Sequence, residues 1–150
     1  MTDQTHINKS LSRRWFEEVW NQGRTRAIDE LLAPDCVAHG LGEEGQPLRG
    51  PEHFRRFYDQ FRSAFPDVRV QVEDVIAEGD KTAVRFSFRA THSGHGLGVP
   101  PTGRPVNVTG MVAMRWANGQ IAEAWNEFDA AALLRQITQT APAAKVRATV

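Results

Sequence analysis

The length, composition and charge of this chain indicate one globular domain and exclude several functions. Its 150 residues suit a single domain, and 41% hydrophobic and 24% charged residues are ordinary values for such a fold. Eighteen basic residues balance eighteen acidic ones, so the chain lacks the positive charge of a nucleic-acid-binding protein. Because Cys36 is the only cysteine, an intrachain disulfide is impossible and a cysteine-based zinc site is nearly excluded.

No targeting or membrane segment is apparent in the sequence. Residues 1–5 do not begin a charged region followed by an apolar stretch, and no segment approaches about 18 consecutive apolar residues. The sequence therefore predicts a cytoplasmic protein that does not bind membranes.

Hydrophobic spacing predicts three helices in the first part of the chain. A four-residue repeat from Ile7 to Val19 predicts an amphipathic helix that ends at residues 21–23. A second helix is expected over residues 26–32, where Pro34 stops it. A third begins at residues 50–51, with proline at its first position, and ends near residue 65. Its aromatic face consists of Phe54, Phe57, Tyr58 and Phe61.

From residue 68 onward the apolar residues alternate with polar ones, which is the period of a β-strand. Strands are expected over residues 68–76, with a bulge near Asp74, and over 84–92, 106–116 and 120–128. Asn118-Gly119 predicts a two-residue hairpin turn between the last two. Asp129 can cap a final helix. The domain is expected to cover residues 1–139, and residues 140–150 to form a disordered tail.

Helices followed by a meander of long strands predict an α+β fold with helices on one face of a mostly antiparallel sheet. A curved sheet wrapped around its helices would leave a cone that is open at one end and encloses a pocket. The glycine- and proline-rich loop over residues 93–105 could close over the mouth of this pocket or simply connect two strands.

Several short motifs occur in the order and spacing of a known family. They are residues 35–39, Ala64-Phe65-Pro66-Asp67, Glu78-Gly79-Asp80, Thr91-His92-Ser93-Gly94, residues 99–104 (Val-Pro-Pro-Thr-Gly-Arg), and residues 119–125 together with Asp129. In these motifs the chain resembles the SnoaL-like polyketide (ester) cyclases of the NTF2-like group of cone-shaped folds, and the match extends from about residue 15 to residue 136.

This resemblance implies a ring closure without a cofactor. In such a reaction an aspartate removes a C–H proton beside an ester or ketone, and the resulting enolate attacks a second carbonyl in an intramolecular aldol step. The family's aspartate matches Asp129. The substrate would be a small hydrophobic carbonyl compound of polyketide type, and the protein a homodimer joined through the outer face of its sheet.

Two readings of Asp129 and of the last strand remain open. Asp129 is either only a helix cap or also a general base. A regular strand places Glu123 and Trp125 on the same face as Ile121, inside the pocket. Alternatively that face points outward, while Ala122, Ala124 and Phe128 pack inward.

The hairpin register decides which side chains can pair with Glu123. A two-residue turn at 118–119 places Met114 opposite Glu123 and Arg115 opposite Ala122. A contact between Arg115 and Glu123 would therefore need a bulge.

Two histidines are further candidates for acid–base chemistry. His39 and His92 each stand near a predicted strand end, where a histidine either forms a structural hydrogen bond or polarises a carbonyl near neutral pH. No tight histidine spacing suggests a metal ligand set, so neither a metal nor a cofactor is predicted.

Aromatic side chains are the candidates for binding the substrate, although most of them could equally form the core. The expected set is Trp20, Phe54, Tyr58, Phe61 and Trp125. Two other functions stay open: a different enzyme on the same scaffold, such as an isomerase or epoxide hydrolase, and a noncatalytic module that binds a hydrophobic ligand.

Overall fold

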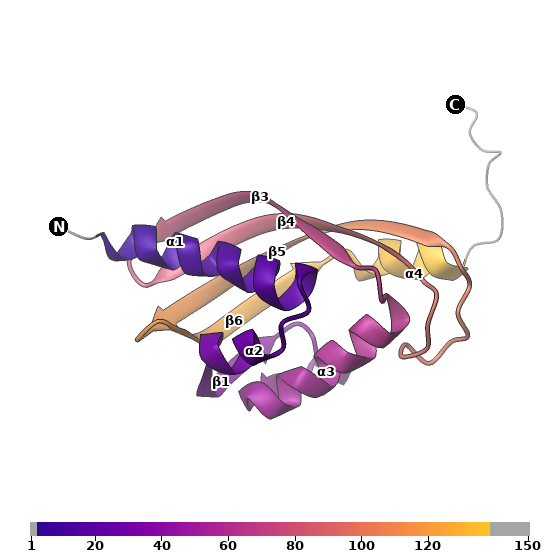
Figure 1. Cartoon of the computed structure of the whole chain (residues 1–150), viewed down its shortest axis with the longest axis horizontal. Coiled ribbons are helices and arrows are strands. Elements are labelled where there is room, and N and C mark those ends of the chain that lie inside the picture. The colour runs from indigo at the N-terminus through magenta and orange to yellow at the C-terminus, as the bar shows by residue number, and fades with distance from the viewer. Residues whose placement is uncertain (1–2, 139–150) are drawn as a thin grey trace.

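The computed structural model describes residues 3–138, which form helices on the concave side of one curved sheet (Figure 1). The expected tail over residues 140–150 lies outside the described residues. Among the described helices, none is long and apolar enough to span a membrane.

The first helix starts as an α-helix and continues as a π-helix. Helix α1 covers Gln4–Arg14, and the carboxylate of Asp3 caps it by accepting a hydrogen bond from the backbone N–H of Thr5. The π-helix η1 covers Trp15–Asn21, so the predicted extent is confirmed, but the second half is not α-helical. The wider turn of a π-helix, with i→i+5 hydrogen bonds, lets three aromatic residues of η1 reach the interior: Trp15, Phe16 and Trp20.

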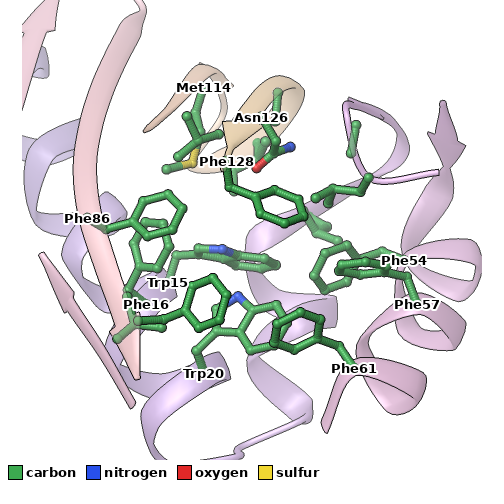
Figure 2. A pocket seen from close by; sticks show the side chains of 18 of the residues that line it. Trp15, Phe16, Trp20, Phe54, Phe57, Phe61, Phe86, Met114, Asn126 and Phe128 are labelled. Atoms are coloured by element: carbon green, nitrogen blue, oxygen red, sulfur yellow. The ribbon is translucent and has the colours of Figure 1, made fainter. Parts of the chain in front are cut away.

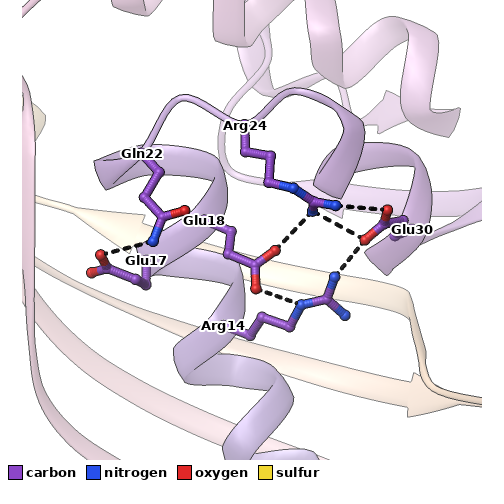
Figure 3. A network of polar contacts seen from close by, with 6 residues as sticks. All are labelled: Arg14, Glu17, Glu18, Gln22, Arg24 and Glu30. Carbon is purple, nitrogen blue, oxygen red and sulfur yellow. Dashed lines mark hydrogen bonds and ion pairs between the residues drawn. The ribbon is translucent and has the colours of Figure 1, made fainter.

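A network of ion pairs fixes η1 against the next helix, α2, which covers Arg26–Leu31 (Figure 3). Arg14 Nε donates to Glu18 at 2.7 Å, and Arg24 donates to Glu18 at 2.9 Å and to Glu30 at 3.1 Å. Arg14 also pairs with Glu30. These pairs are partly exposed, so we assign them a role in orienting η1 rather than a large stabilisation.

Strand β1 begins where the sequence predicts the end of a helix. It covers Leu32–His39 and follows α2 directly, so Leu32 belongs to the strand and not to the helix expected over residues 26–32. Pro34 has no backbone N–H to donate to a neighbouring strand. It is tolerated because the pairing of β1 with β6 is irregular between Leu32 and Val37, so no hydrogen bond between the strands is lost there. A short 3₁₀ turn η2 (Glu43–Gly45) and the two-residue strand β2 (Leu48–Arg49) follow.

Helix α3 covers Gly50–Ala64 and buries the predicted aromatic face, since Phe54, Tyr58 and Phe61 are all buried. The hydroxyl of Tyr58 donates to the carbonyl oxygen of Val19 at 2.7 Å, which joins α3 to η1.

The sheet has six strands in the order β2-β1-β6-β5-β4-β3. Four long strands form the predicted meander: β3 (Arg69–Glu78), β4 (Lys81–Thr91), β5 (Pro105–Ala117) and β6 (Gln120–Phe128). The expected bulge is present, between Val72 and Asp74. Strand β1 pairs with β6 in parallel, and the other pairs are antiparallel. The predicted mixed, mostly antiparallel α+β fold is therefore confirmed.

The core lies between this sheet and the helices. Val84, Val112 and Met114 face α1 and η1 from the concave side. One buried polar contact crosses the interface, because the hydroxyl groups of Ser12 and Thr82 lie 2.9 Å apart. Helix α4 (Ala130–Thr138) covers the far end of the sheet, and a second apolar cluster contains its buried Leu133 and Ile137.

Candidate functional site

An apolar cavity of about 90 Å³ lies between the helices and the concave face of the sheet (Figure 2). Predicted ligand-binding residues Trp20, Phe54 and Phe61 line it, as do Trp15 and Phe16. Its remaining walls are formed by Leu32, Cys36, Val37, Ala38, Leu41, Phe57, Val68, Val70, Phe86, Phe88, Val112, Met114, Ile121, Ala124, Asn126, Glu127 and Phe128. Such a lining suits the apolar part of a small organic ligand.

Tyr58, also predicted to bind the substrate, does not line the cavity. It is 2% exposed, and its hydroxyl is occupied by the Val19 carbonyl. Burial raises the pKa of the Tyr58 phenol above its ordinary value. Tyr58 therefore supports the cavity wall from behind, between α3 and η1.

Few polar groups reach the cavity, and one of them, the amide of Asn126, is not among the residues that the sequence singles out. Asn126 projects into it from β6 (Figure 2), and its Nδ2 donates to the backbone oxygen of His39 at 3.0 Å. The indoles of Trp15 and Trp20 lie in the middle of the side chains that line the cavity. Among the described residues neither indole N–H has a hydrogen-bond acceptor. Alternation along β6, once shifted by one residue, would have identified Asn126 as facing inward.

That shift comes from a bulge in the β5–β6 hairpin. The pairs run Ala117↔Gln120, Trp116↔Ile121 and then Arg115↔Glu123, so Ala122 is an extra residue. The bulge places Ile121 and Ala124 inside but Glu123 outside. The expectation that Glu123 shares a face with Ile121 is therefore wrong, because a one-residue slip moves every following side chain to the other face.

The same bulge creates the contact between Arg115 and Glu123 that a regular hairpin would forbid. Glu123 Oε2 lies 2.8 Å from His39 Nε2, and Glu123 Oε1 lies 3.4 Å from Arg115 Nη2. The hydrogen bond with His39 and, more weakly, that with Arg115 lower the pKa of the Glu123 carboxyl. The ring of His39 stacks on Trp125, with centroids 5.8 Å apart. These four predicted site residues thus meet on the outer face of the sheet, and none of them lines the cavity.

Asp129 follows the cavity-lining Phe128 and caps α4. Its Oδ1 accepts a hydrogen bond from the backbone N–H of Ala132 at 3.0 Å. The side chain is exposed and is not part of the cavity lining. Asp129 therefore stands beside the cavity wall rather than inside it.

His92 is fully buried, beyond the cavity, where it holds the long loop between β4 and β5. Its Nδ1 lies 3.1 Å from the hydroxyl of Thr102, and its backbone bonds to Arg104 and Gly103. Its ring lies 5.5 Å from Phe65, and its Nε2 has no partner within the described chain. Burial, with a smaller effect from His95, lowers the pKa of the His92 imidazole.

The loop that His92 holds contacts the end of α3 and does not line the cavity. The N–H of Gly94 donates to the carbonyl oxygen of Ala64, and a Cβ on Gly96 would lie 2.2 Å from the carbonyl oxygen of Gln60. Of the two expectations for residues 93–105, the structure favours a connection that is packed on the fold.

This buried histidine predicts a loss of stability in mild acid. Because its pKa is lowered in the folded state, the unfolded chain binds a proton first as the pH falls below about 6.5, the ordinary histidine value. The free energy of unfolding should then fall by up to about 1.4 kcal/mol per pH unit from this group. The free energy of unfolding, measured with urea between pH 7.5 and 5, should decrease less steeply with falling pH in His92→Gln than in the wild type. His6→Gln, which changes an exposed histidine, should keep the pH dependence of the wild type. An equal pH dependence for His92→Gln and the wild type would contradict the prediction.

The comparisons with known proteins agree with this architecture. The family model of the SnoaL-like polyketide cyclases matches residues 10–137. No curated protein sequence matches the chain. A proposed SnoaL-like polyketide cyclase from Jannaschia sp. CCS1 is 27% identical, with a TM-score of 0.84 over 95% of this chain and 98% of that one.

Two Streptomyces proteins are also similar. IdmH from Streptomyces antibioticus, a proposed polyketide cyclase, is 34% identical over 85% of this chain and 95% of its own, with a TM-score of 0.73. AclR from Streptomyces galilaeus, a proposed hydroxylase, is 25% identical over 94% of this chain and 88% of its own, with a TM-score of 0.80. The curved open sheet, its helices and the apolar cavity between them define an NTF2-like protein. Within that group, the chain belongs to the SnoaL-like polyketide cyclase family.

Proposed function

We propose that this protein closes a ring in a small hydrophobic carbonyl compound by acid–base chemistry that needs no cofactor. The observation that carries the proposal is the aromatic cavity on the concave face, with Asn126 and two indole N–H groups as its polar contacts. Membership of the cyclase family supports the same reaction class.

In the proposed reaction Asp129 is the general base. Its carboxylate removes a C–H proton beside one carbonyl, and the enolate carbon then forms a bond to a second carbonyl of the same molecule. The alkoxide that results takes back a proton, so the product contains the same atoms as the substrate. The indole N–H groups of Trp15 and Trp20 are positioned to donate to a carbonyl oxygen as negative charge develops on it.

Asp129 can reach such a substrate only at the edge of the cavity. Phe128 contributes its side chain to the lining, and Asp129 is the next residue. The reacting C–H group would therefore lie near Phe128, with the apolar body of the substrate deeper between the tryptophans.

Filling the cavity tests this proposal directly. Ala124 lines the cavity and is 8% exposed, so Ala124→Leu should occupy most of the space and lower both affinity and turnover about 100-fold or more, while overpacking costs about 1–3 kcal/mol of stability. Binding is measured by quenching of tryptophan fluorescence with a panel of aromatic diketo esters. Ala117→Leu, at the exposed end of β5, is the matched control. Unchanged binding in Ala124→Leu would place the substrate elsewhere.

A noncatalytic module that binds a hydrophobic ligand is the second candidate function. The observation that favours it is that none of the five predicted catalytic residues lines the cavity: Asp129, His39, His92, Glu123 and Arg115. An epoxide hydrolase is less well supported, since it needs an arginine and carboxylates gathered around a water molecule. Within the described chain, Glu127 is the only acidic residue of the cavity lining, and no arginine is part of it. The cross-strand partner of Glu127 is the exposed Met111, so its side chain lies on the outer face.

We also propose that two copies of this chain associate through the outer face of the sheet. The register places Ile76, Ala83, Ala113 and Trp125 in one row across four strands, and Met111 lies in the next row. Ile76, Met111 and Trp125 are 66%, 51% and 38% exposed, which is typical of an interaction surface when such side chains are contiguous.

Sedimentation equilibrium should then give twice the 16.8 kDa chain mass. Ile76→Glu should give the single chain mass with an unchanged circular dichroism spectrum, whereas Ala117→Glu, outside the row, should leave the dimer intact. A wild-type protein that sediments as a single chain at 100 µM would contradict the proposal.

A further inference from the structure

The cavity is too small for any multi-ring ligand as it stands. A closed apolar cavity of about 150 Å³ is known to accommodate benzene, and this one measures about 90 Å³. Drug-sized ligands occupy pockets of about 300–1,000 Å³. If the proposed function is right, a multi-ring substrate must extend beyond this cavity or displace part of its wall.

One part of the wall separates the cavity from a larger hollow. This hollow, of about 470 Å³, lies between the loop after β1 and helix α3. Leu41 of the loop and Phe57 of the helix line both spaces, and both side chains are half-buried. They are therefore the partition between the two spaces.

We propose that Leu41 and Phe57 form a gate through which an amphipathic ligand reaches the cavity. The flat apolar part of the ligand would lie in the cavity, and an anionic oxygen-bearing tail, a carboxylate or similar group, would remain in the hollow. This inference rests on the proposed function and adds to it the substrate class and the route of access.

The tip of the loop that carries Leu41 is exposed and closed on itself. Residues 43–46 are exposed, and the backbone hydrogen bond within the loop runs from Gln46 N–H to the Glu43 carbonyl oxygen. A Cβ on Gly42 would lie 1.9 Å from the Gln46 carbonyl oxygen, so the loop is closed tightly on itself. Exposed segments with few contacts to the core open at low cost in free energy.

Phe57 belongs to the aromatic group of the cavity. Its ring lies 5.9 Å from both Phe54 and Phe61 and 6.5 Å from Trp20, in tilted or edge-on arrangements. Because Phe57 also lines the hollow, a rotation of this one ring would join the two spaces.

The helix wall of the hollow offers hydrogen-bond donors to the tail of the ligand. His53, Arg56, Phe57 and Gln60 follow the i, i+3, i+4, i+7 spacing of one helix face, and all four line the hollow. His53 accepts the Arg49 N–H at its Nδ1, which leaves Nε2 as a donor. Arg56 forms no ion pair within the described residues. Glu43 and Glu44 are on the opposite, loop side and are exposed, so an anionic tail is expected along α3.

Two fluorescent probes that differ in one charged group test the proposal. N-phenyl-1-naphthylamine is apolar, whereas 8-anilino-1-naphthalenesulfonate carries the same rings and a sulfonate. We expect the wild type to bind both. Arg56→Ala should weaken binding of the sulfonate probe about tenfold, the loss of one charge-assisted hydrogen bond, and should leave the apolar probe within about twofold. Arg26→Ala, which removes an exposed arginine on α2, should change neither.

Stopped-flow mixing tests the gate itself. Leu41→Ala and Phe57→Ala should each accelerate association of the apolar probe about tenfold, because a smaller side chain leaves the partition partly open. Ala117→Leu, at the exposed end of β5 and outside the proposed dimer row, is a control and should not change the rate. Unchanged association rates in both gate variants would overturn the gate, and equal weakening of both probes by Arg56→Ala would overturn the anionic tail.

Ala124→Leu separates these failures from a failure of the proposed function. If it abolishes binding of both probes while the gate variants behave like the wild type, the cavity is the binding site but access lies elsewhere. If it leaves binding unchanged, or the wild type binds neither probe, the proposed site and the gate are both wrong.

Discussion

Replacing Asp129 with asparagine is expected to lower turnover about 10²–10⁴-fold, the usual contribution of a positioned general base. Asparagine is as good a helix cap as aspartate, so the hydrogen bond to the Ala132 N–H should persist and stability should change by only a few tenths of a kcal/mol. The dissociation constant should stay within about twofold, because Asp129 does not line the cavity. The measurement is kcat and KM for a diketo ester that the wild type cyclises.

The matched control for this variant is Glu127→Gln, which changes a nearby carboxylate on the outer face, beside the exposed Met111 of β5, and should keep the wild-type turnover. Full activity in Asp129→Asn would show that Asp129 is not the base. If neither the wild type nor either variant converts any compound of the panel, while all three bind it equally, the protein is the noncatalytic module.

Replacing Gly40 with alanine is expected to destabilise the fold by about 3 kcal/mol or more, a value reached only by a few kinds of substitution. Gly40 has a φ of +90°, and its added Cβ would lie 2.0 Å from the carbonyl oxygen of Asn126. Since that atom belongs to the backbone of β6, it can give way only if β6 shifts. Urea unfolding monitored by tryptophan fluorescence measures the change.

Gly45→Ala provides the comparison for this substitution, because Gly45 also has a positive φ, of +77°, but nothing lies within 4 Å of its Cβ position. Its expected cost is only that of the left-handed backbone, about 1–2 kcal/mol. The difference between the two variants therefore measures the close approach of the chain to Asn126. Equal losses in both would show that this approach does not constrain the fold. A shift of β6 should also weaken ligand binding, because Asn126 projects into the cavity (Figure 2).

Periodicity was enough to predict most of the fold. The α3 face of Phe54, Phe57 and Phe61 and the alternation along β5 are strong regular patterns, and each element forms where they predict it. Short-range rules failed where tertiary contacts decide the structure. Helix propensity does not distinguish the π-turns of η1 from α-turns, and no local pattern indicates that residues 32–35 would extend β1 beside the last strand.

The site was harder to predict because a single extra residue reverses a strand's faces. The Asn118-Gly119 turn is a two-residue hairpin as predicted, but Ala122, three residues after Gly119, breaks the register. Glu123 and Trp125 consequently face outward and Asn126 inward. The cavity aromatics of α3 were predictable because a helix has no comparable slip, and a buried aromatic face keeps its orientation along the whole element.

The parallel pairing of β1 with β6 has a consequence for how the protein is made. The two strands that flank the cavity on this side, Leu32–His39 and Gln120–Phe128, are separated by more than half of the chain. During synthesis the ribosome must therefore release nearly all of the described sequence before β1 can find its partner, and contacts between such distant segments form slowly. Until then the aromatic side chains of η1 and α3 can pack on β4, as Phe16 does on Phe86 and Phe61 on Phe88, but their surface toward β6 stays uncovered. We expect nascent chains that end before residue 120 to expose this surface and to be the species that chaperones bind.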